Sequence, residues 1–523
     1  MRLETWDLRL ETWDLRLETW DLLMKIALEL TVFACGALVM IYEIIGSRIL
    51  SPYIGTSTYV WTSLIGVILA ALSLGYWLGG KTADRKPDLK ILALVIFLAG
   101  GAVAATILFK EIFLSFIAGS PLILELKSVL AALFLFAPAS VLLGFVTPYA
   151  VKLKMLSLED SGKTVGRLYA LSTVGSIFGT FLAGFFLIPF VGSTRTLYLI
   201  GICLIGLSLI LAPFAVTKTN LTILILFVFG IFTTELQGWF LLKASDLHDI
   251  DTEYNRVQIF TMTDERVGRK VRAMAIDPYF IQSKMYLDSD ELASEYANYY
   301  HLIRHFKPDF QQTLLIGGAG YSFPKDYLKT YPDKQIDTVE IDPQMTGIAK
   351  KYFNLRENPN LKIFHEDGRI FLNRADAEKY DAVFLDAFGS LFSVPFHLTT
   401  IEAVSQINRV LKPGGVVIFN VGGAIKGKAS RFLNAELATY RQIFPQVLLF
   451  KVRPERADEE VQNLIIVAVK SQIPVNLKSD DPQLSKILDN SYNQPILSRE
   501  NILTDDLAPV EFYNSYAQTD FQR

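Results

Sequence analysis

Long apolar runs dominate the first 243 residues, and they constrain the fold more than any other feature. A membrane-spanning helix needs about 20 consecutive apolar residues, and runs of this length recur here between short polar breaks. The composition agrees, because 51% of the 523 residues are hydrophobic and only 20% are charged. We expect a transmembrane bundle of about seven helices over residues 24–243. The predicted spans are Ile26–Leu50, Tyr59–Gly80, Leu89–Phe109, Ser128–Ala150, Val165–Val191, Thr196–Val216 and Leu221–Leu242.

Residues 1–23 contain three consecutive copies of the heptad RLETWDL, at Arg2–Leu8, Arg9–Leu15 and Arg16–Leu22. A helix here would carry a Leu/Trp stripe suited to a membrane surface. Identical copies are better explained by a recent duplication in the coding DNA, or by a start codon upstream of a natural Met24. We therefore expect no function for this heptad-repeat extension.

The pattern changes after residue 243 to that of a soluble nucleotide-binding α/β protein. Short aliphatic runs from Thr313 onward alternate with helical stretches, which is typical of a parallel sheet with crossover helices. We expect a Rossmann-like, methyltransferase-type domain over residues 301–523, preceded by a small β-hairpin domain over 252–300. The predicted strands are Thr313–Ile316, Asp337–Ile341, Leu361–Phe364, Ala382–Leu385, Val416–Val421, Val447–Val452 and Leu464–Val469, and the predicted helices are Gln344–Phe353, Thr399–Val410 and Lys428–Ile443.

Candidate functional residues follow the first four strands of this domain, where open α/β sheets bind ligands. The first strand runs into Gly317-Gly318-Ala319-Gly320, and Glu340 follows about 20 residues later. A carboxylate at this spacing can accept hydrogen bonds from both hydroxyls of a ribose. Asp367-Gly368 ends the third strand and suits an adenine amino group. Asp386 ends the fourth strand, beside the expected reactive end of the ligand.

Taken singly, each of these acids is better explained as a solvated turn carboxylate or a helix N-cap. Together, in this order, they favour a nucleoside site. No GxGxxG follows the first strand, so a dinucleotide is disfavoured and a sulfonium nucleoside, which has no pyrophosphate, fits better.

Charge, cysteine and histidine patterns exclude several other classes. The net charge is −3, with 50 basic against 53 acidic residues, so no basic field points to nucleic acid. Cys35 and Cys203 lie in apolar runs, and none of the 5 histidines forms an HExxH motif. We therefore predict no metal site, no disulfide scaffold and no thiol redox chemistry.

The chain resembles the polyamine aminopropyltransferase (spermidine synthase) family, in its bacterial membrane form fused to a major-facilitator-like bundle. The resemblance covers most residues from about 31 to 470. In the membrane half it rests on Tyr42-Glu43, Gly75–Gly80 with Asp84-Arg85, and Gly166–Ala170 followed by Gly175, Gly179 and Pro189. In the soluble half it rests on Ile281–Tyr299, Leu315–Gly320, Val339–Pro343, Asp367-Gly368, Tyr380–Asp386 and Leu411–Gly415.

The resemblance implies transfer of an aminopropyl group from decarboxylated S-adenosylmethionine, a co-substrate and not a tightly bound cofactor, to an amine such as putrescine. Asp386 matches the general base, Tyr299 the tyrosine that positions the acceptor amine, and Gln282 a further substrate-binding residue. The residues implied in binding the donor are Asn255, Tyr300, Gly317, Gly318, Gly320, Glu340, Asp367 and Gly368.

Two departures from the family pattern keep other functions open. Gly320 stands where the family's loop has an Asp that grips the donor's ammonium, and Gly389 stands where a second acceptor-binding Asp is found. Each loss removes a charge-assisted hydrogen bond of about 1.5–3 kcal/mol. One alternative is a methyltransferase that uses S-adenosylmethionine, whose zwitterionic tail suits Gly320. The other is a polyamine transporter or sensor, motivated by Glu43 and the loop Gly79–Arg85.

Loop charges predict the orientation of the bundle in the lipid bilayer. Basic residues cluster in the loops after the second and the fourth span, which should face the cytoplasm. Seven crossings would then put the C-terminal domain outside, against the cytoplasmic side that its chemistry favours. We expect the cytoplasmic side because of this chemistry. The count then requires either that Leu221–Leu242 lies in the interface or re-enters, or that Glu111–Lys127 hides an extra pass. The chain does not indicate whether the protein forms a homo-oligomer.

Overall fold

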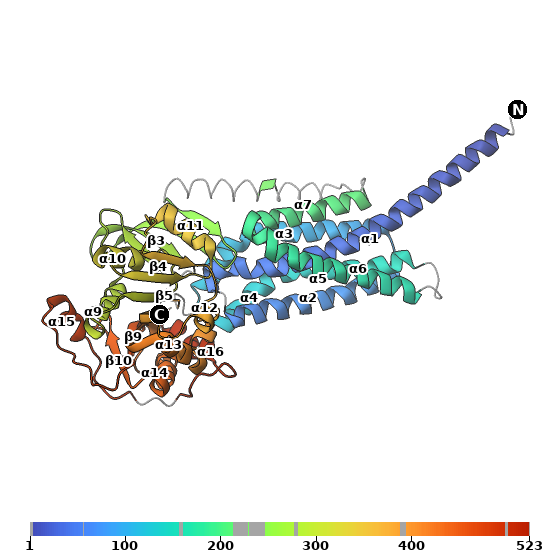
Figure 1. Ribbon diagram of the computed structural model, residues 1–523. Coiled ribbons are helices and arrows are strands. Elements are labelled where there is room, and N and C mark those ends of the chain that lie inside the picture. The colour runs from blue at the N-terminus through green and yellow to red at the C-terminus, as the bar shows by residue number, and fades with distance from the viewer. Residues whose placement is uncertain are drawn as a thin grey trace. The chain divides into compact units, whose positions relative to one another are not determined.

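The computed structural model describes residues 4–55, 57–155, 161–212, 228–229, 246–276, 281–387, 394–496 and 500–521, of which 4–23 and 518–521 are described by their backbone alone. The chain divides into two compact units (Figure 1). The first unit comprises Met1–Leu50 and Tyr59–Phe240, and the second comprises Ser51–Thr58 and Leu241–Arg523.

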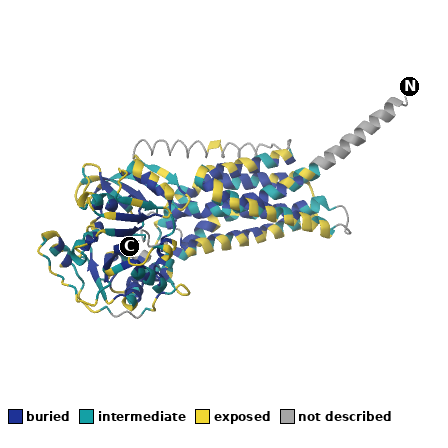
Figure 2. Ribbon diagram, in the orientation of Figure 1, coloured by how far each residue is buried: buried dark blue, intermediate teal, exposed yellow. Residues whose placement is uncertain are grey.

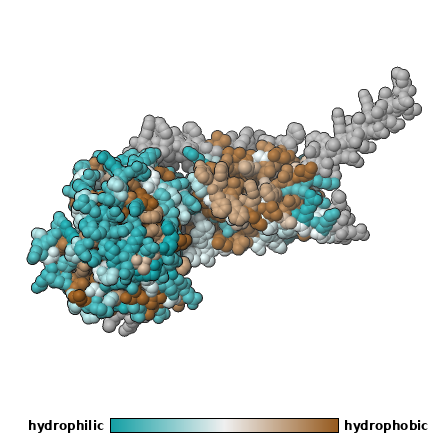
Figure 3. Space-filling model, viewed as in Figure 1, coloured by the Kyte–Doolittle hydropathy of each residue, from teal (hydrophilic) through white to brown (hydrophobic). Residues whose placement is uncertain are grey.

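The first unit is a bundle of long apolar helices. Within the described residues, five helices are long and apolar enough to cross a membrane, or six if α4 and α5, which are bent by 54°, form one span. Hydrophobic residues cover much of the visible surface of this bundle (Figure 3), as lipid contact requires. The elements are α1 (Glu4–Ile54), α2 (Thr58–Arg85), α3 (Leu89–Ala118), α4 (Leu124–Leu135), α5 (Ala137–Lys154), α6 (Ser161–Leu182), the π-helical η1 (Ala183–Val191) and α7 (Ser193–Leu211).

Six of the seven predicted spans correspond to described helices or pairs of consecutive helices of the bundle. The seventh, Leu221–Leu242, lies outside the described residues except for 228–229. The segment Glu111–Lys127 holds no separate span, because α3 extends to Ala118 and α4 begins at Leu124.

Glycines allow close contact between pairs of these helices. A Cβ at Gly175 would clash with the carbonyl oxygen of Phe33, and one at Gly179 with that of Ala37, so α6 packs directly on the backbone of α1. Ser176 Oγ adds a hydrogen bond of 3.1 Å to the carbonyl oxygen of Gly36. Small residues at spacings of four permit such approach in membranes. Gly75 makes the same kind of contact between α2 and α5.

The predicted span Ser128–Ala150 is broken at Phe136, between α4 and α5. Pro138 near the start of α5 has no N–H to continue the helical hydrogen bonding. The hydroxyls of Tyr42 and Thr106 lie 2.9 and 2.7 Å from the carbonyl oxygen of Leu135. Side chains from α1 and α3 thus satisfy the backbone at the break, as a lipid environment demands.

The second unit begins with a four-stranded antiparallel sheet, larger than the predicted hairpin. Its strands pair in the order β1-β2-β3-β4. Apolar side chains of β2, β3 and β4 pack with Met345, Ile348 and Phe353 at helix α11. The strands are β1 (His248–Asp251), β2 (Arg256–Asp264), β3 (Arg269–Ala275) and β4 (Ile281–Tyr286).

A seven-stranded sheet forms the centre of this unit, in the order β10-β11-β9-β8-β5-β6-β7. The strands β7, β6, β5, β8 and β9 pair in parallel, whereas β11 is antiparallel to both β9 and β10. The sheet is therefore mixed, and the prediction of a parallel sheet is wrong at β11. The strands are β5 (Gln312–Ile316), β6 (Gln335–Val339), β7 (Leu361–Phe364), β8 (Tyr380–Leu385), β9 (Leu411–Gly423), β10 (Gln446–Lys451) and β11 (Gln462–Val469).

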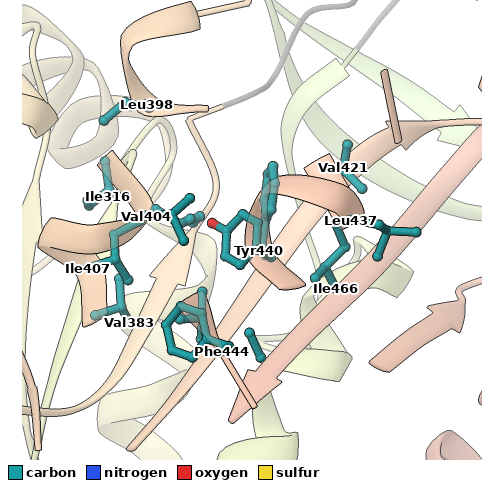
Figure 4. Close-up of a cluster of buried hydrophobic side chains, with 14 of the residues drawn as sticks. Ile316, Val383, Leu398, Val404, Ile407, Val421, Leu437, Tyr440, Phe444 and Ile466 are labelled. Carbon is teal, nitrogen blue, oxygen red and sulfur yellow. The ribbon is translucent and has the colours of Figure 1, made fainter. Parts of the chain in front are cut away.

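Helices cover both faces of this sheet, and the strands are buried between them (Figure 2). Alternate residues of β8 point to opposite faces, so Val383 and Phe384 belong to different clusters. Figure 4 shows part of the cluster that packs against α13 and α14. The helices are η2 (Glu295–Leu302), α9 (Ile303–Phe306), α10 (Ser322–Thr330), α11 (Pro343–Tyr352), α12 (Gly368–Arg374), η3 (Phe396–Leu398), α13 (Ile401–Val410), η4 (Lys428–Ser430), α14 (Arg431–Ile443), α15 (Pro482–Leu488) and α16 (Val510–Phe521).

Candidate active site

A cavity of about 450 Å³ lies at the carboxyl ends of the parallel strands. Most of the residues predicted from the sequence line it, and they come from the two sheets and the loops between them. Three predicted residues, Tyr299, Tyr300 and Gly320, are not part of its wall. The predicted residues that do line it are Asn255, Gln282, Gly317, Gly318, Glu340, Asp367, Gly368 and Asp386.

The glycine loop after β5 is shaped by its lack of side chains. Gly317 has a φ of +98°, which favours glycine. A Cβ at this position would lie 2.6 Å from the backbone oxygen of Asp386, so the loop can pass the end of β8 only as glycine. The Gly317 N–H donates to the carbonyl oxygen of Val339 at 2.9 Å, which ties the loop to β6.

Glu340, at the end of β6, holds the same loop from the other side. Its Oε2 accepts from the N–H groups of Gly318 and Ala319, both at 2.9 Å, and its Oε1 accepts from the Asp342 N–H at 3.0 Å. Burial raises the pKa of Glu340, while these three hydrogen bonds act in the opposite direction. A carboxylate has about four acceptor positions, so Oε1 keeps one for a ligand.

Asp367, at the end of β7, caps helix α12. Its Oδ1 accepts from the N–H groups of Arg369 and Ile370 at 2.8 and 3.1 Å, and its Oδ2 lies 2.9 Å from His397 Nε2. The N-cap role that the sequence left open is therefore real, and the carboxylate also borders the cavity. A Cβ at Gly368 would lie 2.7 Å from Ile316 Cγ2, so glycine lets α12 begin against the end of β5.

Asp386, at the end of β8, receives hydrogen bonds from two neutral side chains. Tyr296 OH donates to Oδ2 and Asn420 Nδ2 donates to Oδ1, each at 3.1 Å. Asn420 is itself held by Asn463, whose Nδ2 donates to Asn420 Oδ1 at 2.9 Å. Burial raises the pKa of Asp386 to about 7, against the lowering effect of these hydrogen bonds. A carboxyl group with this pKa can take up a proton near neutral pH and release it again.

Tyr296, and not the predicted Tyr299, faces Asp386. Tyr299 OH donates to the carbonyl oxygen of Lys451 at 2.7 Å and accepts from Asn490 Nδ2 at 2.8 Å, away from the cavity. Both tyrosines lie on the 3₁₀-helix η2, in which residues three apart share a face but are separated by one turn, about 6 Å along the axis. Tyr299 is not held at the carboxylate, because its hydroxyl is bonded to Lys451 and Asn490.

Gly320 lies elsewhere than expected, and Tyr300 lies behind the cavity wall, beside Asp386. Tyr300 is fully buried, with its ring 4.8 and 5.4 Å from those of Phe323 and Phe384, and its hydroxyl also lowers the pKa of Asp386. The Gly320 N–H donates to Ser283 Oγ at 3.0 Å, and a Cβ on Gly320 would lie 2.7 Å from Ser283 Cβ. An acid at position 320 would have no room unless β4 moved. Gly389, the other departure from the family pattern, lies outside the described residues.

The small sheet supplies two predicted residues to the wall. Gln282 Oε1 accepts from the Ile276 N–H at 2.8 Å, which fixes the side chain beside β3. The Asn255 N–H donates to Thr252 Oγ1 at 2.9 Å in the turn between β1 and β2. These contacts hold both residues at the cavity.

Sequence reasoning missed several polar residues of this cavity. Asn420 is the one polar side chain in the predicted strand Val416–Val421, and inspection of the fifth strand end would have found it. Gln462 and Asn463 lie at the beginning of β11 and pair with Gly423 and Gly422 at the end of β9. They reach the cavity because β11 runs antiparallel, which an apolar run alone does not reveal.

Comparisons with known proteins found similarity to polyamine aminopropyltransferases. Residues 297–455 match the family described as spermine/spermidine synthase domain. The polyamine aminopropyltransferase of Vibrio vulnificus is 32% identical over 171 residues, which cover 32% of this chain and 54%, or about half, of that protein. Polyamine aminopropyltransferase 2 of Aquifex aeolicus is 22% identical over 404 residues, 76% of this chain and 79% of that protein. The crystal structure of a probable spermidine synthase from Corynebacterium glutamicum aligns at 18% identity and a TM-score of 0.38, over 50% of this chain and 91% of that one.

Proposed function

We propose that the second unit, which carries a spermine/spermidine synthase domain over residues 297–455, transfers an aminopropyl group from decarboxylated S-adenosylmethionine to a primary amine such as putrescine. One observation carries this proposal: Glu340, Asp367 and Asp386, which follow the parallel strands β6, β7 and β8, line a single cavity of about 450 Å³. The volume is in the range of small-molecule sites. The nucleoside would lie against Glu340 and Asp367, and the amine beside Asp386.

The proposed reaction is a displacement at carbon. The amine nitrogen attacks the methylene carbon bound to the sulfonium, and a C–N bond forms as the C–S bond breaks. The electron pair of the C–S bond goes to sulfur, which leaves as the neutral thioether methylthioadenosine. The proton lost by the attacking ammonium goes to the Asp386 carboxylate, which must be ionised at the start of the cycle.

The raised pKa of Asp386 supports its role as the base. An alkylammonium group has a pKa of about 10.4, so proton transfer to an ordinary Asp of pKa about 3.9 is unfavourable by about 9 kcal/mol. Transfer to a carboxylate of pKa about 7 is unfavourable by only about 5 kcal/mol. Hydrogen bonds from Tyr296 and Asn420 would orient the carboxylate toward the amine.

Methyl transfer from S-adenosylmethionine is the second candidate, and the surroundings of Gly320 favour it. No acid occupies this position, and the distance of 2.7 Å from a Cβ on Gly320 to Ser283 Cβ leaves no room for one. The donor's tail would therefore meet no carboxylate at this point of the loop. The tail of S-adenosylmethionine carries its own carboxylate beside its ammonium, so it needs no acid of the protein at position 320.

The two candidates differ in their donor, and turnover separates them. The full chain, purified in detergent micelles, would be incubated with either donor and a panel of primary amines that includes putrescine. We expect release of methylthioadenosine from the decarboxylated donor, detected by mass spectrometry. Release of S-adenosylhomocysteine from the ordinary donor would support the methyltransferase, and no turnover of either would refute both candidates.

Removal of the base tests the assignment of Asp386. We expect Asp386→Asn to reduce turnover by about 10²–10⁴-fold and to leave calorimetric affinity for methylthioadenosine within a few-fold. The matched control is Asp376→Asn, the same change at an exposed residue outside the cavity, which should keep full activity. Turnover that persists in the Asp386 variant would mean that another group removes the proton.

A further inference from the structure

The end of the cavity beyond Asp386, here called the acceptor end, has a polarity unsuited to a diamine. We define it by the lining residues Glu295, Tyr296, Arg453, Arg456, Gln462 and Asn463. Its acid, Glu295, is paired with Arg453 at 2.9 Å and with Arg266. The segment after Asp386, residues 388–393, reads FGSLFS and contributes no acid to the sequence.

The other lining acids are also committed to partners of their own. Glu340 accepts three backbone hydrogen bonds, Asp367 caps α12 and contacts His397, and Glu366 is paired with Arg374. Among the described acids that line the cavity, Asp386 is the one bonded only by neutral side chains, and it is available to one ammonium group. Glu340 is bonded only by backbone N–H groups, but it is not one of the residues of the acceptor end, so a second ammonium there would meet only Glu295, which is already paired.

Gln462 supplies a hydrogen-bond donor at the acceptor end. Its Oε1 accepts from the backbone N–H of Arg453 at 3.1 Å, and this contact determines which end of the amide is the oxygen. The residue is only 6% exposed. Its Nε2 is buried and has no hydrogen-bond partner among the described residues. A buried donor of this kind is satisfied by an oxygen acceptor on a ligand and not by an ammonium.

Arg456 adds positive charge next to this donor. Its Nη1 donates to the carbonyl oxygen of Val461 at 2.9 Å, and the Glu460 carboxylate is 3.8 Å from its Nε, beyond hydrogen-bond distance. A guanidinium has five N–H donors, so most of them are available to a ligand. Arg456 lies in the stretch that joins β10 to β11, Gln462 is the first residue of β11, and both line this wall.

We propose that the acceptor substrate is an amine whose far end carries a carboxylate or a comparable anionic oxygen group, as in an ω-amino acid, and not a second ammonium. This inference rests on the proposed aminopropyl transfer and specifies its substrate class. The amine end lies beside Asp386, and the anionic end receives hydrogen bonds from Gln462 and Arg456. The product is the N-(3-aminopropyl) derivative of the amino acid.

Two acceptors with four carbon atoms each test the inference: putrescine, and 4-aminobutyrate, in which a carboxylate replaces one terminal CH₂–NH₃⁺ group. The full chain in micelles is given decarboxylated S-adenosylmethionine and each acceptor, and kcat/KM is measured from methylthioadenosine release. We expect 4-aminobutyrate to be preferred at least tenfold. Preference for putrescine, or equal use of the two, would overturn the inference and leave aminopropyl transfer intact.

Gln462→Glu tests whether the named donor recognises the anionic end. The variant keeps the oxygen that accepts from Arg453 and replaces the Nε2 donor by a carboxylate oxygen, so we expect the preference for 4-aminobutyrate to fall at least tenfold. Gln344→Glu adds the same charge at an exposed position of α11, outside the cavity, and should leave the preference unchanged. An unchanged preference in the Gln462 variant would also overturn the inference.

A binding measurement separates failure of the inference from failure of the proposed function. Both acceptors are titrated calorimetrically into the full chain saturated with methylthioadenosine. If neither acceptor is turned over, aminopropyl transfer is refuted. Tighter binding of 4-aminobutyrate would then still support the acceptor class, whereas tighter binding of putrescine or equal binding would overturn it.

Discussion

Tyr296 should control the pH dependence of turnover, because its hydroxyl donates to the Asp386 carboxylate at 3.1 Å. This hydrogen bond lowers the pKa of Asp386, which burial raises to about 7. The ionised form is the base, so kcat/KM should rise with pH through about 7 in the wild type. In Tyr296→Phe we expect the rise to shift to higher pH and the rate at pH 7 to fall. Rate profiles between pH 5 and 9 would measure both effects.

Tyr299→Phe is the matched control for this prediction. It removes the same hydroxyl one helical turn away, where the partners are Lys451 and Asn490 and not Asp386. We expect a loss of about 1 kcal/mol in stability and no shift in the pH profile. A shift in the Tyr299 variant equal to that in the Tyr296 variant would contradict our assignment of the hydroxyl beside Asp386.

Glu436 should make the protein less stable as pH rises. Its side chain on α14 is fully buried, neither oxygen has a hydrogen-bond partner among the described residues, and burial raises its pKa well above the usual value. The folded state keeps the proton, whereas the unfolded state loses it above pH about 4.3. Stability is therefore present below that pH and is lost as pH rises.

The change Glu436→Gln removes this titration without changing the shape of the side chain. We expect the variant to be more stable than the wild type by about 1–3 kcal/mol at pH 7, and equally stable near pH 4. Thermal unfolding in micelles at both pH values would measure the difference. The control Glu357→Gln, at a side chain that is 89% exposed, should follow the wild type; the same behaviour in the Glu436 variant would contradict the argument.

At the scale of the elements, the contact between α1 and α6 depends on glycine. A Cβ at Gly175 would clash with the backbone of Phe33, so Gly175→Ala should force the helices apart and destabilise the bundle by about 1–3 kcal/mol. Gly166→Ala on the same helix meets nothing within 4 Å and should be neutral or slightly stabilising. Thermal unfolding in micelles would compare the two variants, and equal losses would refute direct backbone packing at Gly175.

Most elements could be predicted from sequence, and the errors have identifiable physical causes. The predicted strand Leu361–Phe364 is β7 itself, because a short apolar run between turns has few other interpretations. The direction of β11 relative to its neighbours could not be predicted, since an apolar run can form either a parallel or an antiparallel strand. The break at Phe136 was also missed. A hydropathy profile sums the two helices on either side of the break and so does not show it. The side chains that bond to the free carbonyl oxygen at the break, Tyr42 and Thr106, are far away in sequence.

The candidate site was predictable where one local pattern determines it. Glu340, Asp367 and Asp386 each follow a strand, so the parallel order of the strands brings them to one cavity. Tyr296 and Tyr299 could not be told apart, because both belong to one aromatic segment and their hydroxyls bond to residues that are far away in sequence. Gln462 and Asn463 required knowledge of how β11 pairs with β9.

At the scale of the whole molecule, ion pairs join the basic segments of the bundle. Glu29 is paired with Lys154 and Arg167, and Lys152 with Asp84 at 3.0 Å. The bundle therefore brings together the loops that the sequence predicts to be cytoplasmic. The second unit, however, includes Ser51–Thr58, which contains the loop between α1 and α2, and one span separates this loop from the basic loops. We still propose that the C-terminal unit lies on the cytoplasmic side, because its proposed nucleoside chemistry favours that side, and the two arguments make opposite predictions.

Reporter fusions test this orientation. A green fluorescent protein joined after Arg523 should fluoresce in a bacterial host, and alkaline phosphatase at the same place should be inactive. Fusions truncated at Ser120, in the loop between α3 and α4, should give the opposite result. An active phosphatase after Arg523 would put the second unit outside and would contradict a cytoplasmic donor.

The close approach of Gly320 to Ser283 also limits how this chain can change over generations. A mutation that introduced an acid at 320 would meet the Cβ of Ser283 at 2.7 Å, so it would be harmful before it could bring any benefit. It would be tolerated only after a change at Ser283, or a shift of β4, had made room for it. Descendants of this gene are thus held to a loop without an acid unless a permissive change comes first, and the history of one small contact decides which donors remain within reach.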